Sequence, residues 1–351
     1  MHARLVLALV LIGLSLSGCG GHNGPAEDVT QVPKTVLAKP DRRIVLVIPL
    51  GSGAVVGFVG QDERGVPWSA IGRMGDDGTV TPLRLPPVPG CPRHTSYDPI
   101  GLLPDGRLGY RTYCTAGVNP GRGVDRQYLR AVDLRTGATT GPGQDPMREA
   151  GAPMTPSWSP DLREAVAVGR YGDLWRLRPA PERLRPGVVE VTEAVWSADG
   201  AHLALLAGDC RGDHESGIRC REQGIDTMAK HLYFVPVDRS SASPPEPVAE
   251  RFYYPSQLAL SPDGYTLALA ASVDDDGWES GVWTVDLRTG RQCRLLRDGP
   301  GGGGEPGSPA WSADGRTLGL VIDGRAVLLD VGSAGGRCGG PALAPPGGQE
   351  H

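Results

Sequence analysis

The thiol of Cys19 is the first group in this sequence with a chemistry that its neighbours suggest. It follows one basic residue, an apolar stretch over residues 5–16, and the small residues Ser17 and Gly18. This order is typical of a secretory signal peptide, in which small residues let the peptidase approach the backbone. We therefore predict a signal peptide over residues 1–18, and a Cys19 thiolate free to accept a lipid.

The string Leu16-Ser17-Gly18-Cys19 resembles the bacterial lipobox. The resemblance implies transfer of a diacylglyceryl group to Cys19, cleavage before it, and anchoring on the extracytoplasmic face of the cell membrane. Two acyl chains would hold durably, because each buried methylene contributes about 0.8 kcal/mol and one chain alone holds only marginally. Two alternatives stay open, namely an ordinary signal with an incidental cysteine and an uncleaved anchor, although a spanning helix needs about 20 apolar residues.

The remaining cysteines agree with an exported protein, in which disulfides form and persist. They are Cys91, Cys114, Cys210, Cys220, Cys293 and Cys338. Sequence alone cannot choose among their pairings. Proximity favours the pairs Cys91–Cys114, Cys210–Cys220 and Cys293–Cys338. The alternative is a metal site, but no C-x-x-C or Cys/His pair has the spacing of metal ligands.

Composition favours a protein made of short strands and many turns. The chain has 52 glycines and 33 prolines, and these alternate with short apolar runs. No long stretch beyond the signal has helical periodicity. The net charge of −5 argues against a nucleic-acid partner.

Five segments share one turn pattern, W/L-S-P/A-D-G or a close variant. Proline presets φ, aspartate binds its own backbone and glycine accepts positive φ, so the pattern predicts a tight hairpin turn. The aspartates are Asp105, Asp161, Asp199, Asp263 and Asp314. In three segments a tryptophan precedes the aspartate by three residues and is expected to be a buried anchor: Trp158, Trp196 and Trp311.

A second pattern, V-D-L-R-T-G, occurs at residues 132–137 and 285–290, where it predicts a third strand and another turn. Strand, turn, strand, loop, strand, turn and strand make one four-stranded propeller blade. An earlier unit without the first pattern fits residues 44–85, which gives six blades, with seven left open. Residues 29–37 are expected to close the ring by pairing with the last blade, which would remove free sheet edges.

Both patterns resemble the WD-like propeller repeats of the TolB family, over about residues 96–331. The resemblance implies an all-β propeller and a binding scaffold in the cell envelope, with the repeat residues structural. TolB carries an additional N-terminal α/β domain without a counterpart here, so a role in a Tol–Pal system is not carried over. The expected organisation is a signal peptide at 1–18, a lipidated tether at 19–40, a propeller at 41–338 and a tail at 339–351.

The sequence holds no recognisable catalytic motif. There is no G-x-S-x-G, no H-E-x-x-H and no P-loop, so we predict no catalytic residue, no metal and no cofactor. Residues 274–276 and Glu279 could bind Ca²⁺, but a solvated acidic tip is the favoured interpretation. The candidate recognition loop, which could also be an ordinary ordered polar loop, contains Asp209, Asp213, His214 and Glu215.

These features favour a monomeric, membrane-anchored and non-catalytic scaffold that binds a protein, peptide or glycan. The first alternative is a propeller enzyme of lyase, glycosidase or dehydrogenase type, and the second is a sensor domain that gates a membrane partner. Carboxylates and basic groups converging at the channel mouth would favour the enzyme. A shallow, apolar or mixed face would favour the scaffold.

Overall fold

The computed structural model describes part of the chain, and the statements below refer to that part. It comprises residues 27–28, 34–36, 42–61, 63, 65, 67–88, 91, 95–103, 105–114, 127–140, 157–161, 163–169, 172–177, 182–188, 190–208, 229–238, 245–253, 255, 258–272, 280–297 and 309–332. Within these ranges all regular structure is β-strand. None of the described residues forms a helix with the length and apolar character needed to span a membrane.

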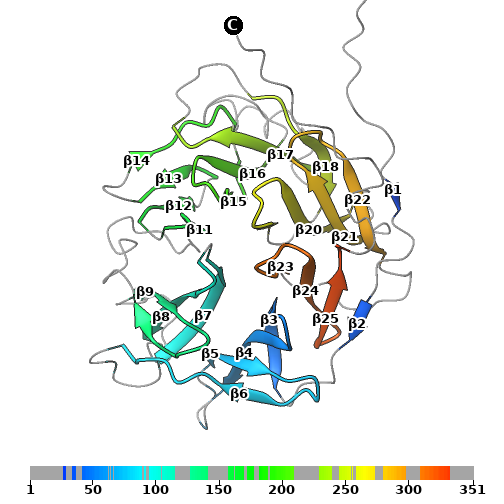
Figure 1. Cartoon of the computed structure of the whole chain (residues 1–351). Coiled ribbons are helices and arrows are strands. Elements are labelled where there is room, and N and C mark those ends of the chain that lie inside the picture. Colours follow the sequence, from blue (N-terminus) through cyan, green and yellow to red (C-terminus); the bar gives the residue numbers. More distant parts are fainter. Residues whose placement is uncertain are drawn as a thin grey trace, which may run out of the picture.

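The strands form six blades of four strands around one axis (Figure 1). Blade A has β3 (Arg43–Pro49), β4 (Ala54–Gln61), β5 (Pro67–Met74) and β6 (Val80–Pro82). Blade B has β7 (Thr95–Leu102), β8 (Leu108–Cys114), β9 (Gln127–Val132) and β10 (Thr139–Thr140). Blade C has β11 (Ser157–Trp158), β12 (Ala165–Val168), β13 (Leu174–Arg176) and β14 (Glu182–Arg183).

Blade D has β15 (Glu193–Trp196), β16 (His202–Gly208), β17 (Ala229–Pro236) and β18 (Ala249–Tyr253). Blade E has β19 (Ala259–Leu260), β20 (Thr266–Ser272), β21 (Ser280–Asp286) and β22 (Gln292–Arg297). Blade F has β23 (Ala310–Trp311), β24 (Thr317–Ile322), β25 (Arg325–Asp330) and β2 (Lys34–Val36). The predicted six-bladed all-β propeller is confirmed.

The ring is closed by the N-terminal segment, as predicted. Strand β2 pairs antiparallel with β25, with Lys34 opposite Leu329 and Val36 opposite Val327. It thereby supplies the outermost strand of the last blade. A further strand that the sequence did not indicate, β1 (Glu27–Asp28), runs parallel to β22 on the edge of blade E. Both strands fall within the range expected to be tether.

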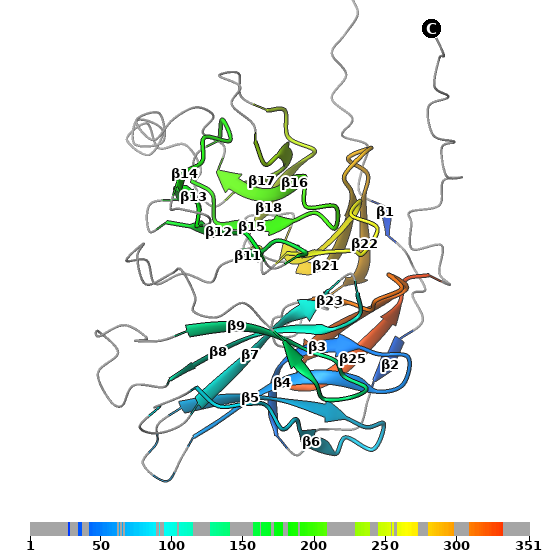
Figure 2. The same ribbon diagram turned by 60° about the vertical axis from the view of Figure 1, so that its left-hand side comes forward.

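Every blade interface contains its own apolar core. Six clusters of buried side chains each join two neighbouring blades, which fixes the order A to F and returns from F to A. The cluster between blades C and D, for example, joins Leu174 to Leu205 and Tyr233, all at most 2% exposed. Figure 2 shows the blades stacked face against face around the ring. Each sheet therefore buries both faces against its neighbours.

The ring has two different faces because each blade is an antiparallel meander. We call turn face the side that carries the turns from first to second strand and from third to fourth strand. We call loop face the side that carries the connections from second to third strand and from blade to blade. Residues 115–126, 209–228 and 273–279 lie outside the described part, and the strand ends that flank them lie at the loop face.

The repeated turns are built around a serine and an aspartate on the turn face. In blade F, Ser312 Oγ donates to Asp314 Oδ1 at 2.6 Å and accepts from Thr317 N at 2.9 Å. Asp314 Oδ1 also accepts from Arg316 N at 3.1 Å, and Gly315 takes φ of 66°. The Ser312 hydroxyl and this amide hold the pKa of Asp314 below its usual value. The same arrangement recurs around Asp161, Asp199 and Asp263.

The turn in blade B and the second pattern use aspartate in the same way. Asp105 Oδ1 accepts from Arg107 N at 3.0 Å, although Leu103 replaces the serine. Asp286 Oδ1 accepts from Arg288 N at 2.9 Å and from Thr289 N at 3.1 Å. These bonds fix the turns between third and fourth strands and so set the outer strands of the blades.

The tryptophans of the repeat tie neighbouring blades together by hydrogen bonds. Trp196 Nε1 of blade D donates to Ser157 O of blade C at 3.0 Å, and Trp311 Nε1 of blade F donates to Ala259 O of blade E at 3.0 Å. Both indoles are almost fully buried. The side chains expected to be end-of-strand anchors therefore also join the inner strands of adjacent blades.

Removing one indole donor should weaken the ring. In Trp311→Phe, Ala259 O loses its buried partner, which costs about 1–3 kcal/mol, so the urea midpoint of unfolding should fall. Trp196→Phe should lower the urea midpoint in the same way, because Ser157 O loses the hydrogen bond from the indole. Trp68→Phe is the control, because Trp68 makes an edge-on contact with Phe58 and its indole has no hydrogen bond to any described residue. Equal losses in all three variants would assign the effect to packing alone.

Candidate functional site

A cavity of about 1580 Å³ occupies the centre of the ring, lined by the inner strands of all six blades. Its wall mixes apolar and polar side chains, and the apolar part includes Val45 and Ile100, which are 41% and 37% exposed. Large apolar side chains with that much exposure are rare in the described part of the chain. An apolar cavity with a few converging polar groups is the usual form of a ligand site.

A polar cluster borders this cavity between blades A and B, in the half of β7 nearer the loop face. Arg111 Nη2 donates to Asp98 Oδ2 at 2.7 Å, and Ser69 Oγ donates to Asp98 Oδ1 at 2.6 Å. Burial raises the pKa of the neighbouring Tyr113 phenol, and the carboxylate of Asp98 raises it further. Asp98 and Arg111 line the cavity as an ion pair. Their opposite charges cancel, so they add polarity without net charge.

Among the acidic residues that line the cavity, Glu193 has the most strongly shifted pKa. It begins β15 at the loop face, is only partly exposed, and accepts a hydrogen bond from Leu258 N at 2.6 Å. Burial raises its pKa to about 7, against the opposing effect of that hydrogen bond. A carboxyl that titrates near neutral pH in a cavity can donate or accept a proton there.

Glu190 lines the same end of the cavity in a strained backbone conformation. Its φ is 55°, a region that non-glycine residues rarely occupy and that costs about 1–3 kcal/mol. Two glycines leave room for Glu190. A Cβ on Gly172 would lie 2.5 Å from Glu190 Cα, and a Cβ on Gly208 would lie 2.8 Å from Glu190 Oε2. Lys230 adds a positive charge to this part of the lining.

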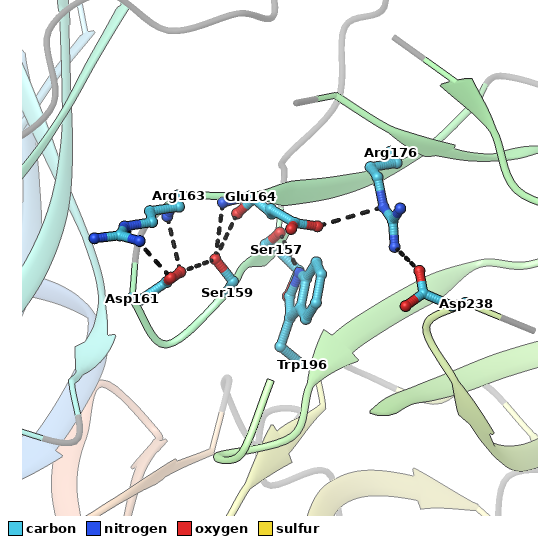
Figure 3. A network of polar contacts seen from close by, with 8 residues as sticks. All are labelled: Ser157, Ser159, Asp161, Arg163, Glu164, Arg176, Trp196 and Asp238. Atoms are coloured by element: carbon cyan, nitrogen blue, oxygen red, sulfur yellow. Dashed lines mark hydrogen bonds and ion pairs between the residues drawn. The ribbon is translucent and has the colours of Figure 1, made fainter. Parts of the chain in front are cut away.

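A smaller cavity of about 580 Å³ lies on the turn face between blades B, C and D. Its charged side chains are engaged with one another. Asp161, for instance, binds Arg163, and farther out Arg176 binds Asp238 at 2.6 Å and Glu164 at 3.4 Å (Figure 3). These contacts tie blade C to blade D, and we interpret this cavity as structural.

Many of the predicted site residues lie outside the described part. They are Cys19, Cys210, Cys220, Cys338, Asp209, Asp213, His214 and Glu215, together with the acidic tip. Of the predicted disulfides, Cys91 is bonded to Cys114, with their Cα atoms 5.5 Å apart. Cys293 is also disulfide-bonded and fully buried. No cluster suited to a metal ion occurs among the described residues.

The central polar residues were not found from the sequence. Asp98 and Glu193 are far apart in the chain, and neither belongs to a motif. One signal was present for Glu193, a charged residue at the start of the otherwise apolar inner strand β15. Asp98 lies within β7, after Thr95, Ser96 and Tyr97, and had no such signal.

No protein-family model and no curated protein matches this sequence. Among solved structures, TolB from Acinetobacter baumannii aligns at 15% identity and a TM-score of 0.47, covering 79% of this chain and 63% of that chain, less than two thirds of its length. The β-propeller domain of Cps50 (Swd1) from Myceliophteria thermophila aligns at 13% identity and a TM-score of 0.49, covering 85% and 100%. A chain of a mitotic checkpoint complex aligns at 12% identity and a TM-score of 0.41, covering 93% of this chain and 99% of that chain. At these values the likeness concerns the fold, which the six blades establish by themselves.

Replacing Glu193 should change how stability depends on pH. Because its pKa is raised to about 7 in the folded protein from 4.5, the folded state binds a proton more readily than the unfolded state, so stability falls as pH rises from about 4.5 to about 7. Glu193→Gln mimics the protonated form and should reduce that fall in urea unfolding between pH 5 and 8. Glu182→Gln, an exposed control on β14, should leave it unchanged. Parallel pH profiles for wild type and Glu193→Gln would contradict the assignment.

Proposed function

We propose that this protein is a monomeric, lipid-anchored binding scaffold on the extracytoplasmic face of the membrane. In this proposal its central channel and loop face bind a protein, peptide or glycan partner. The observation that carries its binding role is the central cavity, whose mixed apolar and polar wall is contributed by all six blades. A site of this kind gives contact area through the wall and orientation through the polar groups.

The anchoring part of the proposal rests on the sequence. The Leu16-Ser17-Gly18-Cys19 string supports lipidation of Cys19, and the disulfides at Cys114 and Cys293 agree with an oxidising compartment. In the sequence, the candidate loop over residues 209–215 follows β16, whose end lies on the same side as the polar end of the cavity. That shared side supports its proposed part in recognition.

An enzyme is the second candidate, and one observation favours it. Glu193 has a pKa of about 7 in a cavity that also contains Arg111 and Lys230, which is the convergence of acidic and basic groups that such an enzyme needs. Turnover of a small glycan or related substrate that is lost in Glu193→Gln, together with recovery of no partner, would replace the scaffold by the enzyme.

A charge placed in the channel wall should reduce partner capture. Val45 and Ile100 are exposed, so Val45→Asp with Ile100→Asp should fold while opposing an apolar contact. Crosslinking in the native envelope, followed by mass spectrometry, should recover less of the partner with this variant than with wild type. Thr81→Asp, on the outer strand β6 of blade A, is the control and should capture normally. Equal capture by both variants would move the binding site away from the channel.

Loss of the thiol should release the protein from the membrane. Cys19→Ser cannot take a thioether-linked lipid, so the variant should leave the membrane fraction and appear in soluble fractions. The matched control is Ser17→Ala, which keeps a small residue before the cysteine and should remain bound. Membrane retention of Cys19→Ser would show that lipidation does not hold the protein.

A further inference from the structure

The first paired strand of the chain enters the ring from the turn face. Glu27 lies opposite Cys293 and Asp28 opposite Arg294, in parallel register. Strand β22 follows the turn after Asp286, so its own start lies at the turn face. A parallel partner runs in the same direction. The N-terminal end of β1, at Glu27, therefore lies toward the turn face of blade E.

The second N-terminal strand has the same direction. Strand β25 runs toward the turn face, and β2 is antiparallel to it, with Lys34 opposite Leu329 near that end. Figure 1 shows β1 and β2 on the same outer edge of the ring, beside β22 and β25. Two separate pairings thus place the entry of the chain at the turn-face side of blades E and F.

The distance between Cys19 and this entry point is limited by the chain. Residues 20–26 separate Cys19 from β1, and seven residues span at most about 25 Å even when fully extended. A lipid on Cys19 would therefore hold the edge of blade E close to the bilayer. This limit is much tighter than the one expected from a tether that ends at residue 40.

An exposed aromatic side chain lies on the same face of the same blade. Tyr265, in the turn between β19 and β20, is 42% exposed, and the Arg288 guanidinium lies over its ring at 4.9 Å. Among the described residues, the other large apolar side chains with comparable exposure are Val45 and Ile100, which line the channel instead. Tyrosine and arginine suit the membrane–water interface, since each combines an apolar body with a polar tip.

We propose that the turn face of blade E, centred on Tyr265 and Arg288, contacts the lipid headgroup region of the membrane. The polar loop-face end of the channel then points away from the bilayer, toward partners outside. This inference rests on the proposed lipidation of Cys19. It also requires the short connection to β1, since a long tether would leave the ring free to turn.

Photo-crosslinking to lipid tests this orientation in the full chain in its native envelope. A photoreactive amino acid replaces Tyr265, Arg297 or Arg135, one per variant. Arg297 ends β22 at the loop face of the same blade, and Arg135 occupies the turn of blade B that corresponds to the turn of Arg288. Lipid adducts, measured by mass spectrometry of the labelled peptides, should be several-fold more abundant from position 265 than from position 297. Position 135, on the opposite blade, should give fewer adducts than position 265.

Membrane fractionation distinguishes a failure of the proposed lipid anchor from a failure of the proposed orientation. A protein that leaves the membrane fraction before crosslinking contradicts the lipid anchor itself. A protein that stays in the membrane fraction but gives equal or more adducts from position 297 overturns the orientation alone. A Gly-Ser insertion of about 15 residues between Gly24 and Pro25 lengthens the flexible connection. It should bring the adduct yields from positions 265 and 297 closer together, and an unchanged ratio would contradict the role of the short connection.

Discussion

Burial of both faces of every sheet is the constraint on which this structure depends. A four-stranded sheet with two apolar faces must find a cover on each side, and here each blade covers the next. The six interface cores form a closed cycle, so no blade is left with an open face. Closure depends on β2, which completes blade F from the opposite end of the chain. Residues 34–36 are thus required for the last blade to be complete.

The repeat residues serve this closure in two ways. The Ser-Asp turns fix where the first strand ends and the second begins, so each inner strand is placed at the same height in the ring. The indoles of Trp196 and Trp311 then join inner strands of neighbouring blades by hydrogen bonds. These bonds lie on the turn face, whereas the acidic groups of the channel lie toward the loop face. Glu193, Glu190 and Asp98 lie at that side.

The sequence predicted the parts of the fold that repeat and missed those that arise from closure. Local turn chemistry revealed the hairpins around Asp161, Asp199, Asp263 and Asp314, because proline, aspartate and glycine act within a few residues. The last strand of blade A, expected to reach Leu85, ends at Pro82. Leu83 N still donates to Ile71 O at 2.8 Å, so the pairing extends one residue beyond that end. The channel site was missed because its members come from different blades and meet only when the ring closes.

In the anchored protein that we propose, strands β1 and β2 attach the N-terminal segment to the ring through different numbers of strand pairs. Tension on a lipid at Cys19 reaches β1 first, and β1 is held by two parallel pairs at the edge of blade E. Strand β2, which closes the ring, is held by three antiparallel pairs and lies farther along the chain. By this count β1 is the weaker of the two attachments, and β2, which completes blade F, is the stronger one. An anchor attached directly to the closing strand would instead transmit every displacement to the element on which the fold depends.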